Sequence, residues 1–221
     1  MRITKEDFIL ELINGGYLKT ASVIEAFQKI DRIDFVPAEF QDQAYGNYPL
    51  PIGFEQTISQ PLTVAFMLEL LQPQPGEKIL DVGSGSGWQT ALLAYIVSRQ
   101  IDKKEKIKKK KYGKVIAFER IPELKKMTEE NVTEYNFVKS GIVEVILGDG
   151  SRGYPSEASF DKIIAAAAGE ELPSAWKEQL KIGGRIVAPI KDSIFAFDKI
   201  SEKEFRKEEY PGFAFVPLIK T

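Results

Sequence analysis

Short apolar runs alternate with longer segments of helical periodicity from residue 78 onward, and this alternation restricts the possible folds more than any other feature. The helical segments cover 88–98, 122–136 and 172–181, and the apolar runs are 78–82, 114–118, 143–147, 161–166 and 185–190. Strands that alternate with helices predict a parallel sheet with helices on both faces. Two further apolar runs, 193–200 and 213–219, have no strong helical stripe between them, so we expect an antiparallel end to the sheet.

Residues 1–72 precede this pattern and have a different character. Apolar residues at helical spacing predict helices at 5–13, 20–30 and 61–71, the last with proline in its first turn. The stretch PIGFEQTISQP (51–61) fits neither a helix nor a strand pattern and reads as an irregular loop. We therefore predict an α/β fold in one domain, residues 1–221. Its parts are an N-terminal helical extension (1–72) and a Rossmann-like, doubly wound, mostly parallel seven-stranded sheet with an antiparallel C-terminal end (73–221).

Composition excludes several kinds of chemistry. The 221 residues include no cysteine and no histidine, which removes thiol nucleophiles, the commonest general base and the usual ligands of transition metals, so we expect no metal site. No run of eighteen apolar residues and no signal-peptide pattern is present, so we expect no membrane association and a cytoplasmic location. The net charge of -2 gives no general attraction to nucleic acid.

Seven lysines crowd the segment DKKEKIKKKKY (102–112). Blocks of like charge are usually solvated, so we interpret this segment as an exposed insert. A patch for nucleic acid or another anionic partner is the alternative, although Tyr112 is its only aromatic residue for stacking.

A glycine-rich turn, ILDVGSGSGWQT (79–90), follows the first predicted strand of the sheet. Glycines let the backbone turn sharply and approach a ligand, and the helix starting near Trp88 would direct free N–H groups toward that ligand. The spacing Gly83-Gly85-Gly87 is neither the dinucleotide Gly-x-Gly-x-x-Gly pattern nor a phosphate-binding P-loop. A purely structural turn is the alternative.

Acidic residues follow the next two predicted strands. Glu119 ends the second strand, where a carboxylate can accept hydrogen bonds from both hydroxyls of a ribose. Asp149 follows the third strand, where we expect the edge of an adenine, although Asp-Gly also favours a plain tight turn. A solvated strand-end carboxylate is the alternative for Glu119. Together these strand ends predict an adenosine site without pyrophosphate-binding groups, which fits S-adenosylmethionine.

The glycine turn with Glu119 and Asp149 resembles the class I S-adenosylmethionine-dependent methyltransferases, and the rest of the chain resembles one subfamily, the protein-L-isoaspartate O-methyltransferases. QTISQP (56–61) is the most specific element of this resemblance. The other matching segments are RIDFVP (32–37), AYGNYPLPIG (44–53), LDVGSGSGWQT (80–90), VIAFERIPEL (115–124), GDGSRGYP (148–155), FDKIIAAAA (160–168), LPSAW and QLKIGGRIVAPI within 172–190, and FVPLI (215–219).

The resemblance implies a repair enzyme that methylates the α-carboxylate of isoaspartyl residues in damaged proteins, after which the ester collapses to a succinimide. Residues 1–72 would form the acceptor side, Ser59 would be the catalytic-site serine, and isoaspartyl proteins would be the partners of a monomeric enzyme. The implied cofactor contacts are Thr57, Ile58, Asp81, Gly83, Ser84, Gly85, Gly87, Glu119, Asp149 and Gly150.

Carboxylate methylation suits this composition, because an isoaspartyl carboxylate is already ionised at neutral pH and needs no base. Three alternatives remain. Ser59 could cap the helix that begins near Pro61. The Phe54-Glu55 pair, bulkier than is usual in the family, could alter the acceptor side and favour another carboxylate substrate. Finally, the chain could bind the cofactor without turnover.

Overall fold

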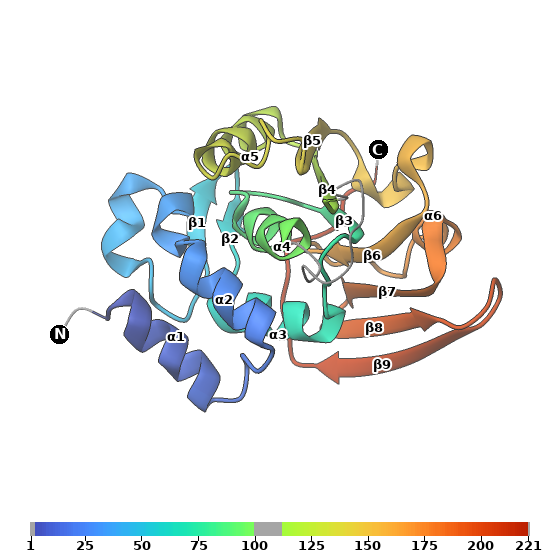
Figure 1. Cartoon of the computed structure of the whole chain (residues 1–221), viewed down its shortest axis with the longest axis horizontal. Helices are drawn as coiled ribbons and strands as arrows, with labels where there is room; N and C mark the ends of the chain where they lie inside the picture. Colours follow the sequence, from blue (N-terminus) through green and yellow to red (C-terminus); the bar gives the residue numbers. More distant parts are fainter. Residues whose placement is uncertain (1–2, 100–111, 221) are drawn as a thin grey trace, which may run out of the picture.

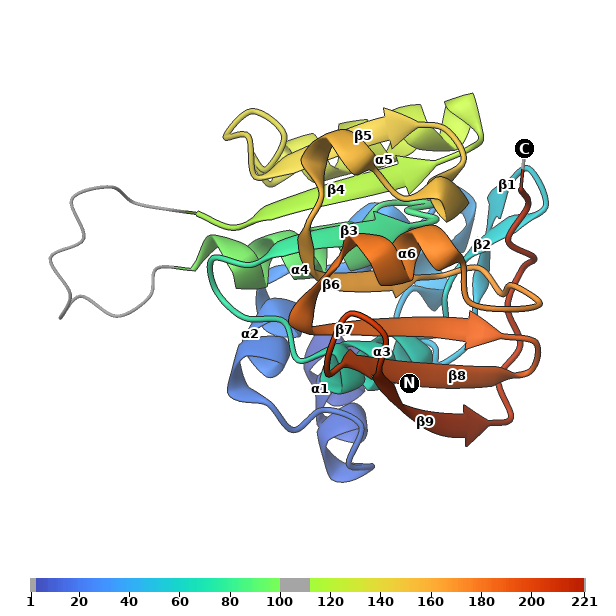
Figure 2. The same ribbon diagram turned by 90° about the vertical axis from the view of Figure 1, so that its right-hand side faces the viewer.

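The computed structural model describes residues 3–99 and 112–220, so the lysine-rich insert, apart from Tyr112, lies outside the described residues. Within this part of the chain, a seven-stranded sheet has the strand order β5-β4-β3-β6-β7-β8-β9 (Figures 1 and 2). Its strands are β3 (Lys78–Val82), β4 (Lys114–Glu119), β5 (Val143–Leu147), β6 (Phe160–Ala165), β7 (Leu180–Ile190), β8 (Ser193–Lys199) and β9 (Phe205–Pro211). The predicted fold class is confirmed.

Strand β3 lies in the parallel part of the sheet, between β4 and β6. The chain continues from β3 to β4 and β5 on one side and later returns to β6 and β7 on the other. This reversal of strand order is a topological switch point, and ligands of open α/β sheets bind outside the carboxyl ends of the strands at such a point. The glycine-rich turn after β3 therefore occupies the place where a ligand is expected.

The antiparallel end of the sheet is confirmed, but its last strand is not the predicted apolar run 213–219. Strand β9 is the charged segment Phe205–Pro211, which pairs with β8 along its whole length. It is an edge strand that is largely exposed, so it carries no apolar alternation that periodicity could detect. Arg206, which donates to Asp198 of β8 at 2.7 Å, illustrates this polar character. Residues 213–219 run instead across the carboxyl edge of the sheet, where Pro217 forms a bridge with Ala168.

Helices cover both faces of the sheet, as predicted. One buried cluster joins α3 (Pro61–Leu71), α4 (Trp88–Ser98) and α5 (Pro122–Glu134) to one face, and a second cluster places α6 (Ser174–Gln179) against the other. Figure 2 shows α6 in front of the sheet, with α4 and α5 behind it. Trp88, the first residue of α4, is only 2% exposed. Helix α4 is thus a central element of the core.

The N-terminal extension packs on α4 and α3. It consists of α1 (Lys5–Asn14), α2 (Ala21–Lys29) and two 3₁₀ helices, η1 (Arg32–Phe35) and η2 (Ala38–Gln43). Thr4 and Asp7 form a reciprocal capping box at the start of α1, and Phe27 of α2 meets Trp88 edge-on, with ring centroids 5.5 Å apart. Short 3₁₀ helices also follow β5, namely η3 (Gly150–Arg152) and η4 (Pro155–Glu157).

The stretch PIGFEQTISQP contains a small antiparallel hairpin, which corrects its interpretation as an irregular loop. Strand β1 (Leu50–Gly53) pairs with β2 (Gln56–Ile58). The two-residue turn between them places Phe54 and Glu55 at positive φ, +54° and +58°, although such turns normally favour Asn-Gly. Strands of three and four residues are too short for a periodicity signal, and the turn lacks its usual residues, so the sequence concealed the hairpin.

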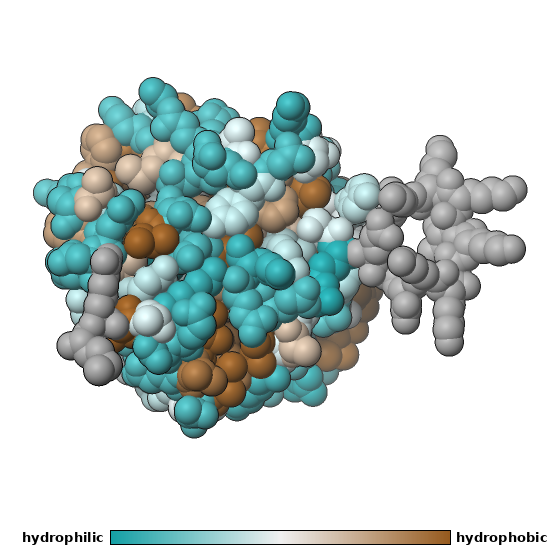
Figure 3. Space-filling view, turned by 60° about the vertical axis from the view of Figure 1, so that its left-hand side comes forward, coloured by the Kyte–Doolittle hydropathy of each residue, from teal (hydrophilic) through white to brown (hydrophobic). Residues whose placement is uncertain are grey.

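The face of the molecule that carries the N-terminal helices is mostly polar (Figure 3). Figure 3 shows the side of the molecule with the N-terminal helices, where hydrophilic residues surround smaller apolar patches. Within residues 3–99 and 112–220, no helix has the length and apolar character needed to cross a bilayer.

Candidate active site

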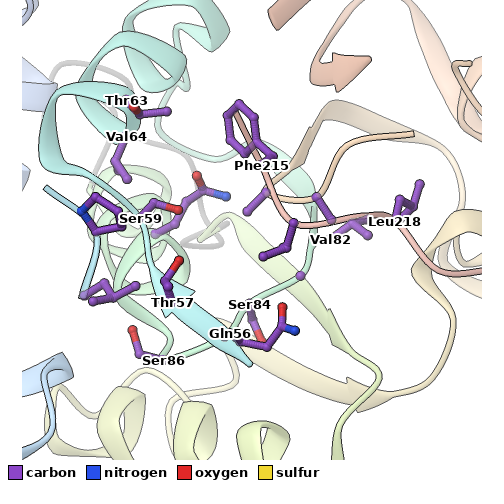
Figure 4. A pocket seen from close by; sticks show the side chains of 18 of the residues that line it. Gln56, Thr57, Ser59, Thr63, Val64, Val82, Ser84, Ser86, Phe215 and Leu218 are labelled. Carbon is purple, nitrogen blue, oxygen red and sulfur yellow. The ribbon is translucent and has the colours of Figure 1, made fainter. Parts of the chain in front are cut away.

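A pocket of about 850 Å³ opens at the carboxyl edge of the parallel strands (Figure 4). Three chain segments that are distant in sequence enclose it: the turns that follow β3 to β6, the end of the β1–β2 hairpin with the start of α3, and the C-terminal segment. The lining includes Gln56–Gln60, Val82–Ser86, Phe118–Arg120, Gly148–Gly150, Ala166, Ala167 and residues 211–219. This volume lies within the range of small-molecule sites.

The glycine turn forms the floor of the pocket. Gly83, Ser84 and Gly85 line it, and Gly83 and Gly85 have φ of +84° and +57°, which residues with a side chain rarely adopt. The Gly83 and Ser84 amides both donate to the carbonyl of Phe118, at 2.8 and 3.1 Å. The turn is therefore tied to β4, and its backbone faces the cavity.

Gly87 is placed differently from the other predicted contacts. It is the N-cap of α4 at φ +91°, and it does not line the pocket. A Cβ atom at this position would lie 3.0 Å from Val132 of α5. The position thus demands glycine for its backbone conformation and for helix packing, and its placement does not support a direct ligand contact.

Asp81 also lies outside the pocket lining. Its side chain is fully buried beneath the glycine turn, where Gln89 Nε2 donates to Oδ1 at 2.8 Å and Thr90 Oγ1 donates to Oδ2 at 2.6 Å. Burial raises the pKa of Asp81 to about 6. The structure therefore does not place this predicted residue in the pocket lining, and its carboxylate holds the first turn of α4 against β3.

Glu119 is the buried acid of the pocket wall, 6% exposed. Its Oε2 accepts from the Gly85 amide at 3.0 Å, and its Oε1 accepts from the amides of Arg120 and Ile121 at 2.8 and 3.0 Å. A carboxylate offers about four lone-pair positions, so three backbone donors leave one free, on Oε2. Glu119 thus joins the glycine turn to the end of β4 and keeps capacity for one further donor.

Asp149 and Gly150 line the same wall, after β5. Asp149 Oδ1 accepts from the Ser151 amide at 2.9 Å and caps η3. Asp149 therefore has the turn-forming role that was the alternative in the sequence analysis, and it also lines the pocket. A Cβ atom on Gly150 would lie 2.7 Å from Val82. Glycine is therefore needed here because the backbone packs directly against β3.

Thr57, Ile58 and Ser59 line the same pocket as the glycine turn, on the segment that leads from β2 into α3. Figure 4 shows Ser59 and Thr57 on one side of the cavity, with Val82, Phe215 and Leu218 on the other. Ser59 is not the cap of α3, because the N-cap residue is Gln60. The amide of Leu62 in the first turn donates instead to Asn47 Oδ1 at 3.1 Å. The capping interpretation of Ser59 is therefore wrong, and the residue is partly exposed at the cavity wall.

Sequence reasoning missed the C-terminal wall of the pocket. Residues 211–219 line it, and Phe213 stacks on Phe66 of α3 with ring centroids 5.4 Å apart. Ala168 holds the segment in place, because its N–H donates to Val216 O and its carbonyl accepts from the Leu218 amide, both at 2.8 Å. The motif FVPLI had marked this segment as part of the resemblance, but its apolar character suggested a strand.

Fold and pocket together define a class of open α/β proteins with a site at the topological switch point, lined by a glycine turn and acidic strand ends and without a phosphate-binding loop. Comparison with known proteins specifies the class further. The family model described as protein-L-isoaspartate(D-aspartate) O-methyltransferase matches residues 3–221. A protein-L-isoaspartate O-methyltransferase of Methanopyrus kandleri is 40% identical over 99% of this chain and 92% of its own length. One from Aeropyrum pernix is 42% identical over 95% of this chain and 76% of its own.

A solved structure gives the same picture of the fold. The protein-L-isoaspartate O-methyltransferase of Plasmodium falciparum, in complex with S-adenosyl-L-homocysteine, superposes with a TM-score of 0.83 at 24% identity, over 98% of both chains. Our chain belongs to the protein-L-isoaspartate(D-aspartate) O-methyltransferase family. The predicted family and enzyme class are thereby confirmed.

Proposed function

We propose that the pocket binds S-adenosylmethionine on the glycine-turn wall and an isoaspartyl carboxylate on the Ser59 wall, and that the enzyme transfers the methyl group between them. Methylation of L-isoaspartyl residues in damaged proteins is the activity, and the ester then closes to a succinimide. The observation that carries this assignment is that Ser59 lines one cavity together with Gly83–Gly85 and Glu119.

The lining residues fit the cofactor. The free lone pair on Glu119 Oε2 suits a ribose hydroxyl, Asp149 lies at the adjacent strand end for the adenine, and Gly83 and Gly85 permit close approach. The three amides already on Glu119 favour one ribose contact rather than the two expected from the sequence. When bound, the cofactor supplies a methyl group on a positively charged sulfur.

Protein groups then need only to position the acceptor. An isoaspartyl carboxylate is ionised at neutral pH, so a chain without histidine can use it directly. The Ser59 hydroxyl would donate a hydrogen bond that directs one carboxylate oxygen toward the methyl group, since alignment of the reacting atoms accounts for much of such a rate. A dehydrated cavity favours the step, because opposite charges neutralise each other as the methyl moves. Thr57 and Ile58 would close over both ligands.

Phe54 and Glu55 lie at the tip of the β1–β2 hairpin, outside the pocket lining. Their bulk therefore does not reshape the acceptor wall itself. This placement removes the main reason for preferring a different carboxylate substrate. The monomeric state and the cytoplasmic location stay predictions.

The test is transfer of labelled methyl groups to two peptides that differ only in having isoaspartate or aspartate at one position. We expect methylation of the isoaspartyl peptide alone. Ser59→Ala should lower kcat/KM by on the order of 10- to 100-fold, because the acceptor loses its alignment, and should leave the affinity for S-adenosylhomocysteine unchanged. Ser156→Ala, the same change at an exposed residue outside the pocket, should keep full activity. Equal methylation of both peptides would contradict the proposed activity, and a fully active Ser59→Ala enzyme would contradict the role of the serine.

A further inference from the structure

Arg32 is a cation buried in the acceptor side, and no acidic residue among those described is its partner. Its side chain is 1% exposed, and in the described part of the chain no carboxylate forms an ion pair with it. The neighbouring Asp31 is engaged elsewhere, with Lys5 at 3.2 Å and with the Tyr45 hydroxyl at 2.9 Å. Burial lowers the pKa of Arg32 to about 10, so the group is still protonated at neutral pH. Because a buried charge is costly, an uncompensated one calls for an explanation.

The guanidinium donates to four backbone carbonyls. Nη1 contacts the carbonyls of Ala44 and Gly46 at 2.6 and 3.2 Å, and Nη2 contacts those of Tyr48 and Ser59 at 3.0 and 3.2 Å. One side chain therefore ties the segment 44–48 to the residue proposed to orient the acceptor. The planar fork of arginine can satisfy such a spread of acceptors, whereas lysine has a single point of donation.

Asn47 also connects the segment 44–48 to this part of the chain, through the residues that follow Ser59. Its side-chain oxygen accepts from the Leu62 amide at 3.1 Å, and its carbonyl accepts from Gln60 Nε2 at 3.0 Å. The backbone at Ser59 is thus tied to the segment 44–48 in two ways. Arg32 joins the Ser59 carbonyl to this segment, and Asn47 joins the segment to the start of α3, directly after Ser59. This arrangement restricts the backbone that carries the serine hydroxyl.

Arg32 also lies directly behind the pocket wall. Its guanidinium carbon is 5.4 Å from the ring centre of Trp88, which lines the cavity. The cation–π contact favours a charged group at this site and fixes the distance between the fork and the glycine-turn wall. The arginine therefore links both walls of the pocket without reaching into it.

We propose that Arg32 is a positioning residue for the methyl transfer, which acts by holding the Ser59 carbonyl so that the serine hydroxyl faces the acceptor carboxylate. The inference rests on the proposed role of Ser59. An apolar side chain of similar volume would leave these four carbonyls without their donor, at a cost in stability, and it would release Ser59 from the segment 44–48. The arginine is thus assigned a part in the geometry of the site in addition to its part in stability.

The test is a double-mutant cycle of Arg32→Met and Ser59→Ala, read as kcat/KM for the isoaspartyl peptide. We expect Arg32→Met to lower kcat/KM by on the order of 100-fold in the native background. In the Ser59→Ala background the same change should cost no more than about threefold, because the hydroxyl it positions is gone. The dissociation constant of S-adenosylhomocysteine should change by less than about threefold.

Two further variants separate positioning from folding. Arg32→Lys keeps the charge and part of the hydrogen bonding, so it should fold and show an intermediate loss with the same non-additivity. If Arg32→Met fails to fold, Arg32→Lys replaces it in the double-mutant cycle with Ser59→Ala. Tyr45→Phe removes the bond to Asp31 from the same segment and should leave kcat/KM within about twofold.

Each outcome decides between the proposals. Equal losses from the Arg32 variants in both backgrounds, or an equal loss of S-adenosylhomocysteine affinity, would overturn the positioning role and leave Ser59's role intact. A Ser59→Ala enzyme with full activity would overturn both.

Discussion

At the scale of single residues, the two acidic residues that contact the glycine turn or the helix after it, Glu119 and Asp81, differ in how deeply they are buried and therefore in their roles. Glu119 faces the cavity and keeps hydrogen-bonding capacity for a ligand, whereas Asp81 is fully enclosed and pairs with Gln89 and Thr90. Both are acidic and both flank the same turn, but only the depth of burial separates a candidate ligand contact from a structural carboxylate.

Asp81 should make the stability of the enzyme depend on pH. Its pKa is about 3.9 in an unfolded chain and about 6 in the folded protein. The folded state therefore binds the proton more tightly, and the free energy of unfolding falls as pH rises from 4 to 7, by ~3 kcal/mol from this group. Urea unfolding of the native enzyme and of Asp81→Asn measures this, because the asparagine variant lacks the titration.

The exposed Asp42 supplies the control. Asp42→Asn should follow the native pH dependence. A constant difference in unfolding free energy between the native protein and Asp81→Asn across this pH range would contradict the prediction.

At the scale of elements, helix α3 positions the acceptor wall, and it is fixed at both ends. Asn47 accepts from its first turn, and Arg185 of β7 donates to the Leu70 carbonyl in its last turn at 2.6 Å. The helix ends at Leu71, and its C-cap residue Gln72 has a left-handed conformation, φ +51°, that glycine adopts without strain. The element is thus well anchored but has a strained C-cap.

Gln72→Gly should stabilise the protein by about 0.5–1 kcal/mol, because it relieves the left-handed strain and part of the gain is offset by the freer unfolded chain. Thermal unfolding should show a rise in Tm of about 1–4 °C. Gln74→Gly is the matched control, since Gln74 is also exposed but lacks a positive φ, and it should lower Tm. A lower Tm for Gln72→Gly would refute the strain argument.

At the scale of the whole molecule, the N-terminal extension and the sheet share one core. A single buried cluster includes Phe8 of α1, Trp88 of α4 and Ala196 of β8. The pocket lies where the extension, the sheet and the C-terminal segment meet. A ligand that fills it contacts all three, so its binding free energy should stabilise the molecule as one cooperative unit.

S-adenosylhomocysteine at a hundred times its dissociation constant should add about 2.7 kcal/mol to the free energy of unfolding. For a chain of this size, we expect Tm to rise by about 5–10 °C in a single transition. At the same concentration, Glu119→Gln should show less than about half this rise, because its NH₂ group would oppose a backbone N–H donor and weaken the site.

Glu123→Gln is the same change on the exposed side of α5 and should keep the full rise in Tm. Two separate transitions, or an unchanged rise in Glu119→Gln, would show that the ligand binds elsewhere or that the parts unfold independently.

Much of this architecture could be predicted because the residue pattern within each short segment indicates its secondary structure. The strands 78–82 and 143–147 and the helices 61–71 and 88–98 have the boundaries expected from apolar periodicity. Buried central elements carry such a signal, because neighbours on both sides select their side chains. The glycine turn and QTISQP were recognisable because a special backbone conformation or a particular side chain is required at each position.

Tertiary structure decided the rest. The charged edge strand Phe205–Pro211 takes its conformation from pairing with β8, and the apolar run 213–219 becomes a pocket wall because Ala168 holds it. The hydrogen-bond partners of Arg32 are backbone carbonyls. Every residue has a backbone carbonyl, so no sequence pattern could indicate which ones Arg32 contacts. The sequence by itself determined the family, the sheet and the glycine turn. Only the fold decided which residues face the cavity, because that depends on contacts between distant segments that no local pattern records.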